Sequence, residues 1–212
     1  MSPAISNALR PISTAPVSAV GNQPASLPAV DDNAEVVSLI VVTGPPGAGK
    51  STVAALLAER LERSVLVEGD AFFRFLRSGA VAPWLPEAHE QNTVVTHAGG
   101  AAAGRYARGG FNTVYDGVIG PWFLDDFLAA TGLTSLDYAI LLPAVEVCVE
   151  RVGTRLNHGF SDEAATRHMH HEFARSQYKD RHVIRATNDS PGVVADHIRA
   201  ARNEGALTYT SK

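Results

Sequence analysis

The sequence predicts an α/β fold in which a five-stranded parallel sheet is flanked by helices on both faces and carries a short helical lid. Short apolar runs of strand length alternate with longer segments whose apolar residues recur at helical spacing. A glycine-rich stretch, Gly44–Ser51, joins the first such run to the first such helix. The chain has 212 residues, of which 45% are hydrophobic, so a single domain can bury a sizeable core.

The first half of the predicted sheet begins at 36–43, a mostly apolar run with the length of a buried strand. After the glycine-rich stretch, Val53, Leu57 and Leu61 recur at helical spacing, which predicts a helix over 50–63. The further elements expected before residue 110 are a strand at 64–68 and helices at 71–77 and 87–108.

The long helix expected at 87–108 has a middle, 98–104, that consists of Ala and Gly alone, which predicts close approach to another backbone. Farther along, Pro121 suits the first turn of a helix, and Ser161 or Asp162 can cap another. The elements expected in this second half are strands at 112–115, 136–142 and 182–186 and helices at 121–130, 144–155, 162–178 and 191–203.

Residues 1–33 form a separate segment that is rich in Ala, Ser and Pro, and its prolines interrupt any helical pattern. The sequence therefore predicts a disordered N-terminal tail followed by one domain at 34–212. The pattern breaks again at 157–161, so the helix beyond it is expected to belong to a lid at about 155–178. The tail has no compact apolar stretch after a basic start, and we expect a cytoplasmic protein.

The composition argues against several classes of protein. The formal net charge of −4 gives no general attraction to nucleic acid or to an anionic membrane, and no apolar run reaches membrane-spanning length. Cys148 is the single cysteine, so no intrachain disulfide can form, and its apolar neighbours favour packing over catalysis. We expect a small-molecule partner.

The glycine-rich stretch matches the pattern G-x-x-x-x-G-K-[ST], whose glycines let successive N–H groups point inward around phosphate oxygens. Lys50 can reach the β- and γ-phosphates of a nucleotide, and the Ser51 hydroxyl can ligate Mg²⁺. The positive end of the following helix adds to the attraction. The alternative is a glycine turn that binds nothing. The residues predicted to bind nucleotide here are Gly44, Pro45, Pro46, Gly47, Ala48, Gly49, Lys50, Ser51 and Thr52.

Two aspartates follow predicted strands, at the edge of a parallel sheet where ligands bind. Asp70 is the candidate for aiming and deprotonating an acceptor hydroxyl, and it would lie near the glycine-rich loop if the first two strands were neighbours. Its alternative role is that of N-cap for the helix expected at 71–77. Asp116 is the candidate for binding Mg²⁺ through water, and its alternative role is that of a turn residue before Gly117.

Arginines are the candidates for stabilising transferring charge. Arg151 and Arg155 lie four residues apart on one face of the helix that runs into the break, and Arg167 lies beyond it. The alternative for each is a solvated basic helix face. Arg74, Arg77 and Arg105 could face an acceptor, with weaker support.

Histidines gather at His168, His170 and His171, with His158 nearby. A zinc site on a helix needs two ligands on one face, at a spacing such as i and i+4. No two of these four histidines have that spacing, so we expect a surface patch and no metal centre here.

The chain resembles the nucleotide-kinase-like branch of P-loop proteins, and within it the small-molecule kinases near chloramphenicol phosphotransferase, gluconate kinase and the zeta-toxin-like kinases. The resemblance covers about 36–203 and rests on the Walker A pattern Gly44–Ser51, on 67–70 and 115–122, and on Arg151 and Arg155 before the His-Gly-Phe break.

By this resemblance Asp70 corresponds to the acid that activates the acceptor hydroxyl, and Arg151 and Arg155 correspond to lid arginines that contact ATP phosphates. The same resemblance implies that 187–189, with Asn188 at its centre, passes near the adenine. A paired-arginine clamp for a substrate phosphate is missing from the sequence, which disfavours a nucleotide as acceptor.

The function expected from the sequence is that of an ATP- and Mg²⁺-dependent phosphotransferase that acts on a hydroxyl of a small molecule, such as a metabolite or an antibiotic. One alternative is a polynucleotide 5′-hydroxyl kinase, against which the acidic balance argues. Another is a nucleotide-binding regulatory or resistance module without an acceptor. A ring-bearing or apolar ligand is suggested by five aromatic residues, Phe72, Phe73, Phe75, Trp84 and Trp122, although aromatic residues near helices also pack in cores.

Overall fold

The computed structural model describes residues 38–154 and 162–211. These residues lie in one compact unit, Glu35–Lys212. The tail predicted at 1–33 lies outside the described residues, as do His158 and Arg155. The lid predicted at about 155–178 is described only from residue 162 onward.

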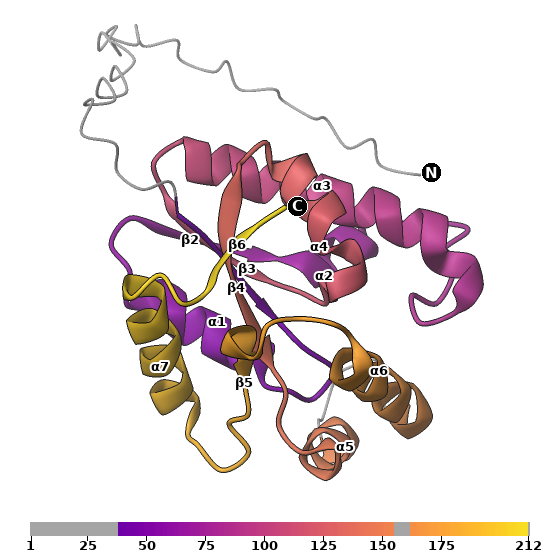
Figure 1. The fold of residues 1–212 in the computed structure, drawn as a ribbon. Coiled ribbons are helices and arrows are strands. Elements are labelled where there is room, and N and C mark those ends of the chain that lie inside the picture. Colours follow the sequence, from indigo (N-terminus) through magenta and orange to yellow (C-terminus); the bar gives the residue numbers. More distant parts are fainter. Residues whose placement is uncertain (1–37, 155–161, 212) are drawn as a thin grey trace, which may run out of the picture. The chain divides into compact units, whose positions relative to one another are not determined.

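The sheet has the predicted parallel core and one strand more than expected (Figure 1). Five parallel strands follow the order β2-β3-β1-β4-β5, so the first strand of the chain lies at the centre. A sixth strand, β6, pairs antiparallel with the beginning of β4 and was not predicted. The strands are β1 (Leu39–Thr43), β2 (Ser64–Glu68), β3 (Asn112–Asp116), β4 (Ser135–Leu141), β5 (Val183–Ile184) and β6 (Thr208–Thr210).

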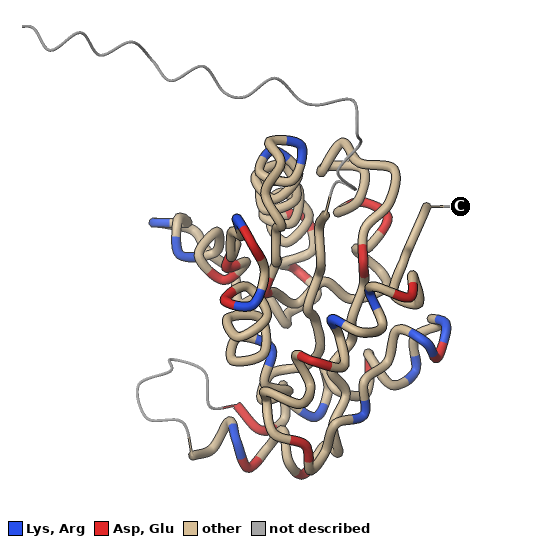
Figure 2. Tube along the Cα trace, turned by 90° about the vertical axis from the view of Figure 1, so that its left-hand side faces the viewer, with Lys and Arg blue, Asp and Glu red and all other residues tan. Residues whose placement is uncertain are grey.

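Charges of both signs are interspersed along the described part of the chain, as the trace in Figure 2 shows. Among the described residues, no helix combines the length and the apolar character that crossing a bilayer requires.

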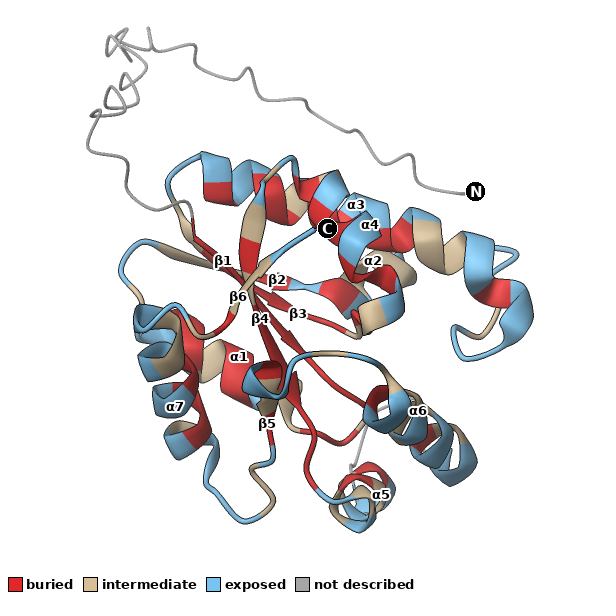
Figure 3. Ribbon diagram, in the orientation of Figure 1, coloured by how far each residue is buried: buried red, intermediate tan, exposed pale blue. Residues whose placement is uncertain are grey.

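Helices cover both faces of the sheet, as predicted (Figure 3). In β1 the side chains of Leu39 and Val41 pack with α3 and α4, whereas Ile40 and Val42 pack with α1 and α7. Because successive side chains point to opposite faces, a strand buried on both faces reads as a continuous apolar run. The helices are α1 (Lys50–Glu59), α2 (Gly69–Arg74), α3 (His89–Arg108), α4 (Pro121–Thr131), α5 (Val145–Thr154), α6 (Glu163–Arg175) and α7 (Pro191–Asn203), with short 3₁₀ turns at η1 (Pro86–Ala88) and η2 (Asp180–His182).

The close approach predicted for the small-residue stretch of α3 is confirmed. Gly100 and Gly104 lie against the backbone carbonyls of Phe127 and Thr131 in α4, where an added Cβ would meet backbone oxygen. The small side chains let the two helix backbones pack directly on one another.

Most predicted elements differ from the observed ones at their ends. The first helix ends at Glu59, because Arg60 closes it and Arg63 adopts a left-handed backbone with φ 45° before β2. The strand predicted at 182–186 is reduced to Val183–Ile184, since η2 occupies the chain before it. Asp162 is the N-cap of α6, where its side chain accepts a hydrogen bond from the Ala165 N–H at 2.9 Å.

Candidate active site

The glycine-rich loop connects β1 to α1, and two of its glycines are required by the packing around them. Gly44 and Gly47 have φ of 143° and 78°, a backbone region that side chains rarely adopt. A Cβ at Gly44 would overlap the Leu141 carbonyl at the end of β4, and one at Gly47 would overlap the Cys148 carbonyl in α5. The loop is therefore held between the sheet and α5.

Lys50 is the first residue of α1 and its side chain returns over the loop. The Nζ ammonium donates a hydrogen bond to the Pro45 carbonyl at 3.1 Å. The ammonium thus lies beside the loop and the N-terminus of α1. The positive potentials of the ammonium, the loop N–H groups and the helix N-terminus add at this place.

Ser51 lies in the first turn of α1, and its hydroxyl interacts with Asp116 at the end of β3. Asp116 ends β3 with 9% of its surface exposed, and the Ser51 hydroxyl donates a hydrogen bond to its carboxylate. Burial raises the pKa of Asp116 above its ordinary value, the positive charge of Lys50 and the Ser51 hydrogen bond lower it, and the negative charge of Asp70 raises it. Two carboxylates, a hydroxyl and an ammonium therefore share one electrostatic environment.

The segment that follows Asp116 is fixed by side chains of two other strands. The Thr43 hydroxyl donates to the Ile119 carbonyl at 3.0 Å and accepts from the Ile119 N–H at 2.9 Å. The Tyr138 hydroxyl donates to the same carbonyl at 2.7 Å. These buried bonds hold Ile119 against the carboxyl end of β1 and the middle of β4.

Two cavities meet at the loop, and Gly49 lines both. The first has a volume of about 350 Å³, and we call it the Asp70 cavity. Its polar lining consists of Lys50, Ser51, Asp70, Asn92, Thr96, Tyr115 and Asp116.

The second cavity has a volume of about 300 Å³, and we call it the Arg151 cavity. It lies toward α7, between the start of α1 and the chain that follows β5. Its lining includes Thr52, Leu141, Arg151, Ala186, Asp189 and Val194.

Asp70 lies in the first turn of α2, directly after β2. The strands β1 and β2 are not neighbours, because β3 lies between them. Asp70 nevertheless lines the same cavity as Lys50, Ser51 and Asp116. The N-cap of α2 is Glu68, which excludes the alternative in which Asp70 caps this helix.

The candidate arginines are placed differently from one another. Arg151 lines the Arg151 cavity and its Nη1 donates to the Gly47 carbonyl at 3.4 Å. Arg167 lines neither cavity, because its guanidinium pairs with Glu163 at 2.9 Å and with Glu146 at 3.9 Å. Arg155 lies outside the described residues.

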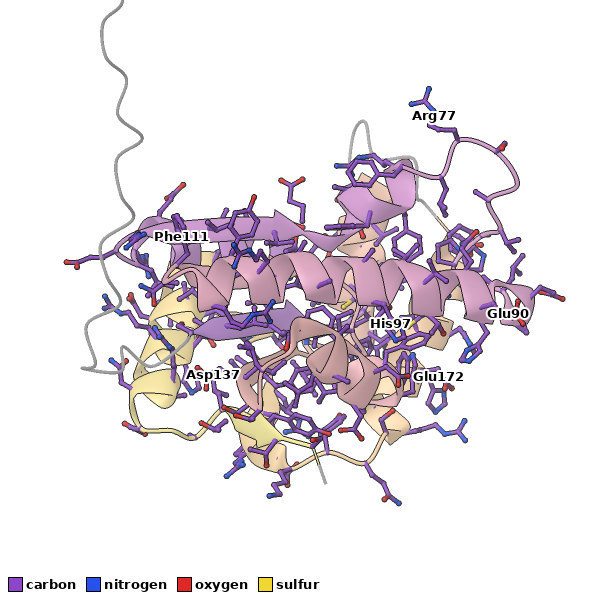
Figure 4. The ribbon with its side chains drawn as sticks, turned by 90° about the horizontal axis from the view of Figure 1, so that it is seen from above. Arg77, Glu90, His97, Phe111, Asp137 and Glu172 are labelled. Carbon is purple, nitrogen blue, oxygen red and sulfur yellow. The ribbon has the colours of Figure 1, made fainter. Side chains whose placement is uncertain are left out.

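The remaining candidates lie away from both cavities. Asn188 is exposed and lines neither, whereas its neighbour Asp189 lines the Arg151 cavity. Arg74 pairs with Glu68 at 3.6 Å, and Arg77 projects away from the helices (Figure 4). Neither of these two arginines nor Arg105 lines a cavity.

The histidine cluster does not form a metal centre in the described part of the chain, where no group of three possible ligands is found. The ring Nε2 of His170 hydrogen-bonds with the Pro143 carbonyl at 2.9 Å, which joins α6 to the chain before α5.

Tyr115 is a cavity residue that sequence reasoning missed. A Cβ added at Gly69 would lie 2.7 Å from the Tyr115 hydroxyl, and one added at Gly99 would lie 2.6 Å from it. The absence of side chains at these two glycines therefore leaves space for the phenol. Burial, followed by the negative charges of Asp70 and Asp116, raises the pKa of Tyr115 far above its ordinary value. The phenol is therefore a neutral hydrogen-bond donor beside two carboxylates. No local sequence pattern marks it as a cavity residue.

Comparison with known proteins extends these findings. The model of an AAA domain family, AAA_33, matches residues 39–179. No curated protein matches the chain.

Several solved structures have the same fold. The tunicamycin resistance protein of Deinococcus radiodurans is 21% identical, with a TM-score of 0.60 over 79% of this chain and 95% of that one. A sugar kinase from Janibacter sp. HTCC2649 is 20% identical, with a TM-score of 0.58 over 78% and 92%. A gluconokinase from Sinorhizobium meliloti 1021 is 19% identical, with a TM-score of 0.55 over 80% and 93%. The predicted nucleotide-kinase-like fold is confirmed by these likenesses.

Proposed function

Because the chain belongs to the AAA_33 family of P-loop domains, we propose that it is an ATP-dependent phosphotransferase that moves the γ-phosphoryl group to a hydroxyl of a small molecule. The observation that carries the proposal is the meeting of two cavities at one phosphate-binding loop, with Gly49 in both walls. A donor on one side and an acceptor on the other would meet at the loop.

On the donor side, the loop amides and Lys50 bind the β- and γ-phosphates. The Arg151 cavity takes the ribose and base. Arg151, which already reaches the Gly47 carbonyl, neutralises phosphate charge during transfer.

Ser51 and Asp116 fit a magnesium ion, because a hydroxyl and a carboxylate already lie within hydrogen-bonding distance beside Lys50. The Ser51 hydroxyl would ligate the ion directly and Asp116 would hold it through water. When bound, the ion supplies positive charge to the phosphate oxygens.

On the acceptor side, Asp70 accepts the proton of the attacking hydroxyl. The hydroxyl oxygen forms a bond to the γ-phosphorus, and the bond from that phosphorus to the β–γ bridging oxygen breaks. The products are ADP and a phosphate ester, and the proton remains on the Asp70 carboxylate until it passes to solvent.

The test is incubation with ATP, Mg²⁺ and a panel of alcohols, sugars and antibiotics, followed by mass spectrometry for the addition of one phosphate. Lys50→Ala is the control variant, and we expect it to lose transfer because the phosphates lose their ammonium partner. A 5′-hydroxyl oligonucleotide in the panel tests the polynucleotide alternative. Thermal stabilisation by ATP without any phosphorylated product would instead favour a binding module and contradict the proposal.

A further inference from the structure

The charges of the Asp70 cavity disfavour an anionic ligand. Among its described lining residues, the single cation is Lys50 and the two carboxylates are Asp70 and Asp116. Lys50 serves the nucleotide phosphates in the proposed function. The described lining therefore offers a carboxylate or phosphate on the acceptor no cationic side chain of its own, and the Asp70 carboxylate repels it.

The walls of this cavity away from the loop are aromatic. Phe73, Trp84, Trp122 and Phe123 line it, and Trp84 and Trp122 keep 39% and 42% of their surface exposed. The Trp122 ring covers Gly120, where a Cβ would overlap it, and packs at 5.3 Å from the Phe173 ring. Broad, half-exposed ring faces suit a flat apolar ring on the ligand.

One polar group in the wall lacks a partner. The Asn92 Nδ2 donates to the Pro83 carbonyl at 2.7 Å, but Oδ1 is buried and accepts no hydrogen bond. In the described part of the chain, no other buried side-chain nitrogen or oxygen is in this state. A buried acceptor without a donor costs free energy that a ligand N–H or O–H would recover.

We propose that the Asp70 cavity selects a ring-bearing alcohol without an anionic group, and that Asn92 recognises a second donor group on it through Oδ1. The ring packs between Trp84 and Trp122, and the reacting hydroxyl faces Asp70. This inference rests on the proposed function, because it takes the Asp70 cavity as the acceptor site.

The structure provides a specific readout for ligand binding. The chain contains two tryptophans, and both of them line the Asp70 cavity. Intrinsic tryptophan fluorescence of the full chain therefore reports on this cavity without requiring turnover. Trp84→Phe and Trp122→Phe assign the signal to one ring or the other.

Four small probes share a phenyl ring and a benzylic hydroxyl and differ in one terminal group. They are 1-phenyl-1,2-ethanediol, 1-phenylethanol, mandelate and 2-amino-1-phenylethanol. The diol is uncharged and carries a second donor, 1-phenylethanol lacks that donor, and the other two carry a negative or a positive charge. Fluorescence titrations in the presence of Mg²⁺ and a non-hydrolysable ATP analogue, whose phosphates occupy Lys50, give the dissociation constant of each.

We expect the diol to bind about 10-fold more tightly than mandelate, because the carboxylate finds no cation. We also expect it to bind about 5-fold more tightly than 1-phenylethanol, because of the hydrogen bond to Asn92. We expect the amine to bind more tightly than mandelate as well, because the Asp70 carboxylate attracts its ammonium group. Binding of mandelate as tight as that of the diol, or no fluorescence change with any probe, overturns the proposed ligand class.

Asn92→Leu should abolish the preference for the diol over 1-phenylethanol. The matched control is Gln91→Leu. Gln91 also anchors the loop before α3, through two 2.8 Å bonds with the backbone of Val81, but it does not line the cavity. Figure 4 shows this loop running from Arg77 to the start of α3 near Glu90. Loss of the preference in both variants, or in neither, would show that Asn92 does not read the second donor.

This inference and the proposed function fail separately. If the probes bind with the expected preferences but no acceptor is phosphorylated, the proposed kinase activity is wrong and the proposed ligand class is retained. Phosphate transfer confined to anionic acceptors would keep the activity and remove the ligand class.

Discussion

At Asp116, protein stability and the proposed magnesium-binding role place opposite demands on one side chain. Its carboxylate is buried, and burial outweighs the favourable effects of Lys50 and Ser51, so its pKa is raised. The folded state therefore pays for keeping this group charged at neutral pH. A neutral side chain would remove that cost and also the water-mediated metal contact proposed for this carboxylate.

We predict that Asp116→Asn raises the free energy of unfolding at pH 7 and lowers phosphate transfer about 10- to 100-fold. The raised pKa means that the folded wild type binds the proton more tightly than the unfolded chain. The stability advantage of the variant should shrink as the pH falls from the raised pKa toward the ordinary value of 3.8. Urea unfolding across this range measures it, and a variant less stable than the wild type at pH 7 would contradict the prediction.

The role proposed for Asp70 gives a second prediction at this scale. Asp70→Asn should leave ATP affinity unchanged and lower the rate of transfer about 10²-fold or more, because the proton acceptor is lost. Calorimetry with ATP and a turnover assay measure the two effects. Unchanged turnover would remove Asp70 from the mechanism.

Single residues were predictable from the sequence where a local pattern marks them. Lys50 and Ser51 belong to a recognisable motif, and Asp70 and Asp116 follow apolar strands. Thr43, Asn92 and Tyr115 have no such pattern. Their roles depend on partners up to 76 residues away, such as the Thr43 bonds to Ile119, and these partners are set by the fold.

At the scale of elements, the contact between α3 and α4 depends on glycines that lie directly against backbone. Gly104 lies against the Thr131 carbonyl at the end of α4, and Arg108, one turn later, donates to the same carbonyl. The composition of 98–104 predicted this close contact, because only small residues allow it.

We predict that Gly104→Ala destabilises the protein by about 1–3 kcal/mol, because the added methyl meets rigid backbone. This cost exceeds the helix-propensity gain of about 1 kcal/mol. Gly153→Ala in α5 is the matched control: its Cβ would meet nothing within 4 Å, and it should stabilise the helix. Thermal unfolding of both variants tests the pair, and shifts of the same sign would refute the explanation.

β6 is the element that sequence reasoning missed. It has three residues, Thr208–Thr210, which is too short for a periodic pattern. Its place is set by distant contacts: Arg181 donates to the Thr208 carbonyl at 2.8 Å, and the Tyr209 hydroxyl donates to Asp125 at 2.7 Å. The order of the strands in the sheet could not be predicted from the sequence either, because the alternation of strands and helices does not determine which strands are neighbours.

For the whole molecule, we predict that removing residues 1–33 leaves the melting temperature and phosphate transfer unchanged. Both core clusters consist of residues between Leu39 and Tyr209, so the domain keeps its buried apolar contacts. Removing 208–212 is the control, and it should lower the melting temperature by about 3 °C or more, because β6 and its two side-chain anchors are lost. A large loss on removing the tail would show that it belongs to the fold.

The shared wall at Gly49 has a consequence for inhibitor chemistry. A purine-bearing arm in the Arg151 cavity and a neutral aromatic arm in the Asp70 cavity would both reach the loop residue Gly49. A single molecule could join the two arms through a short polyphosphate bridge. Once one arm is bound, the other is held near its cavity at a high effective concentration, so the linked molecule should bind more tightly than either arm alone.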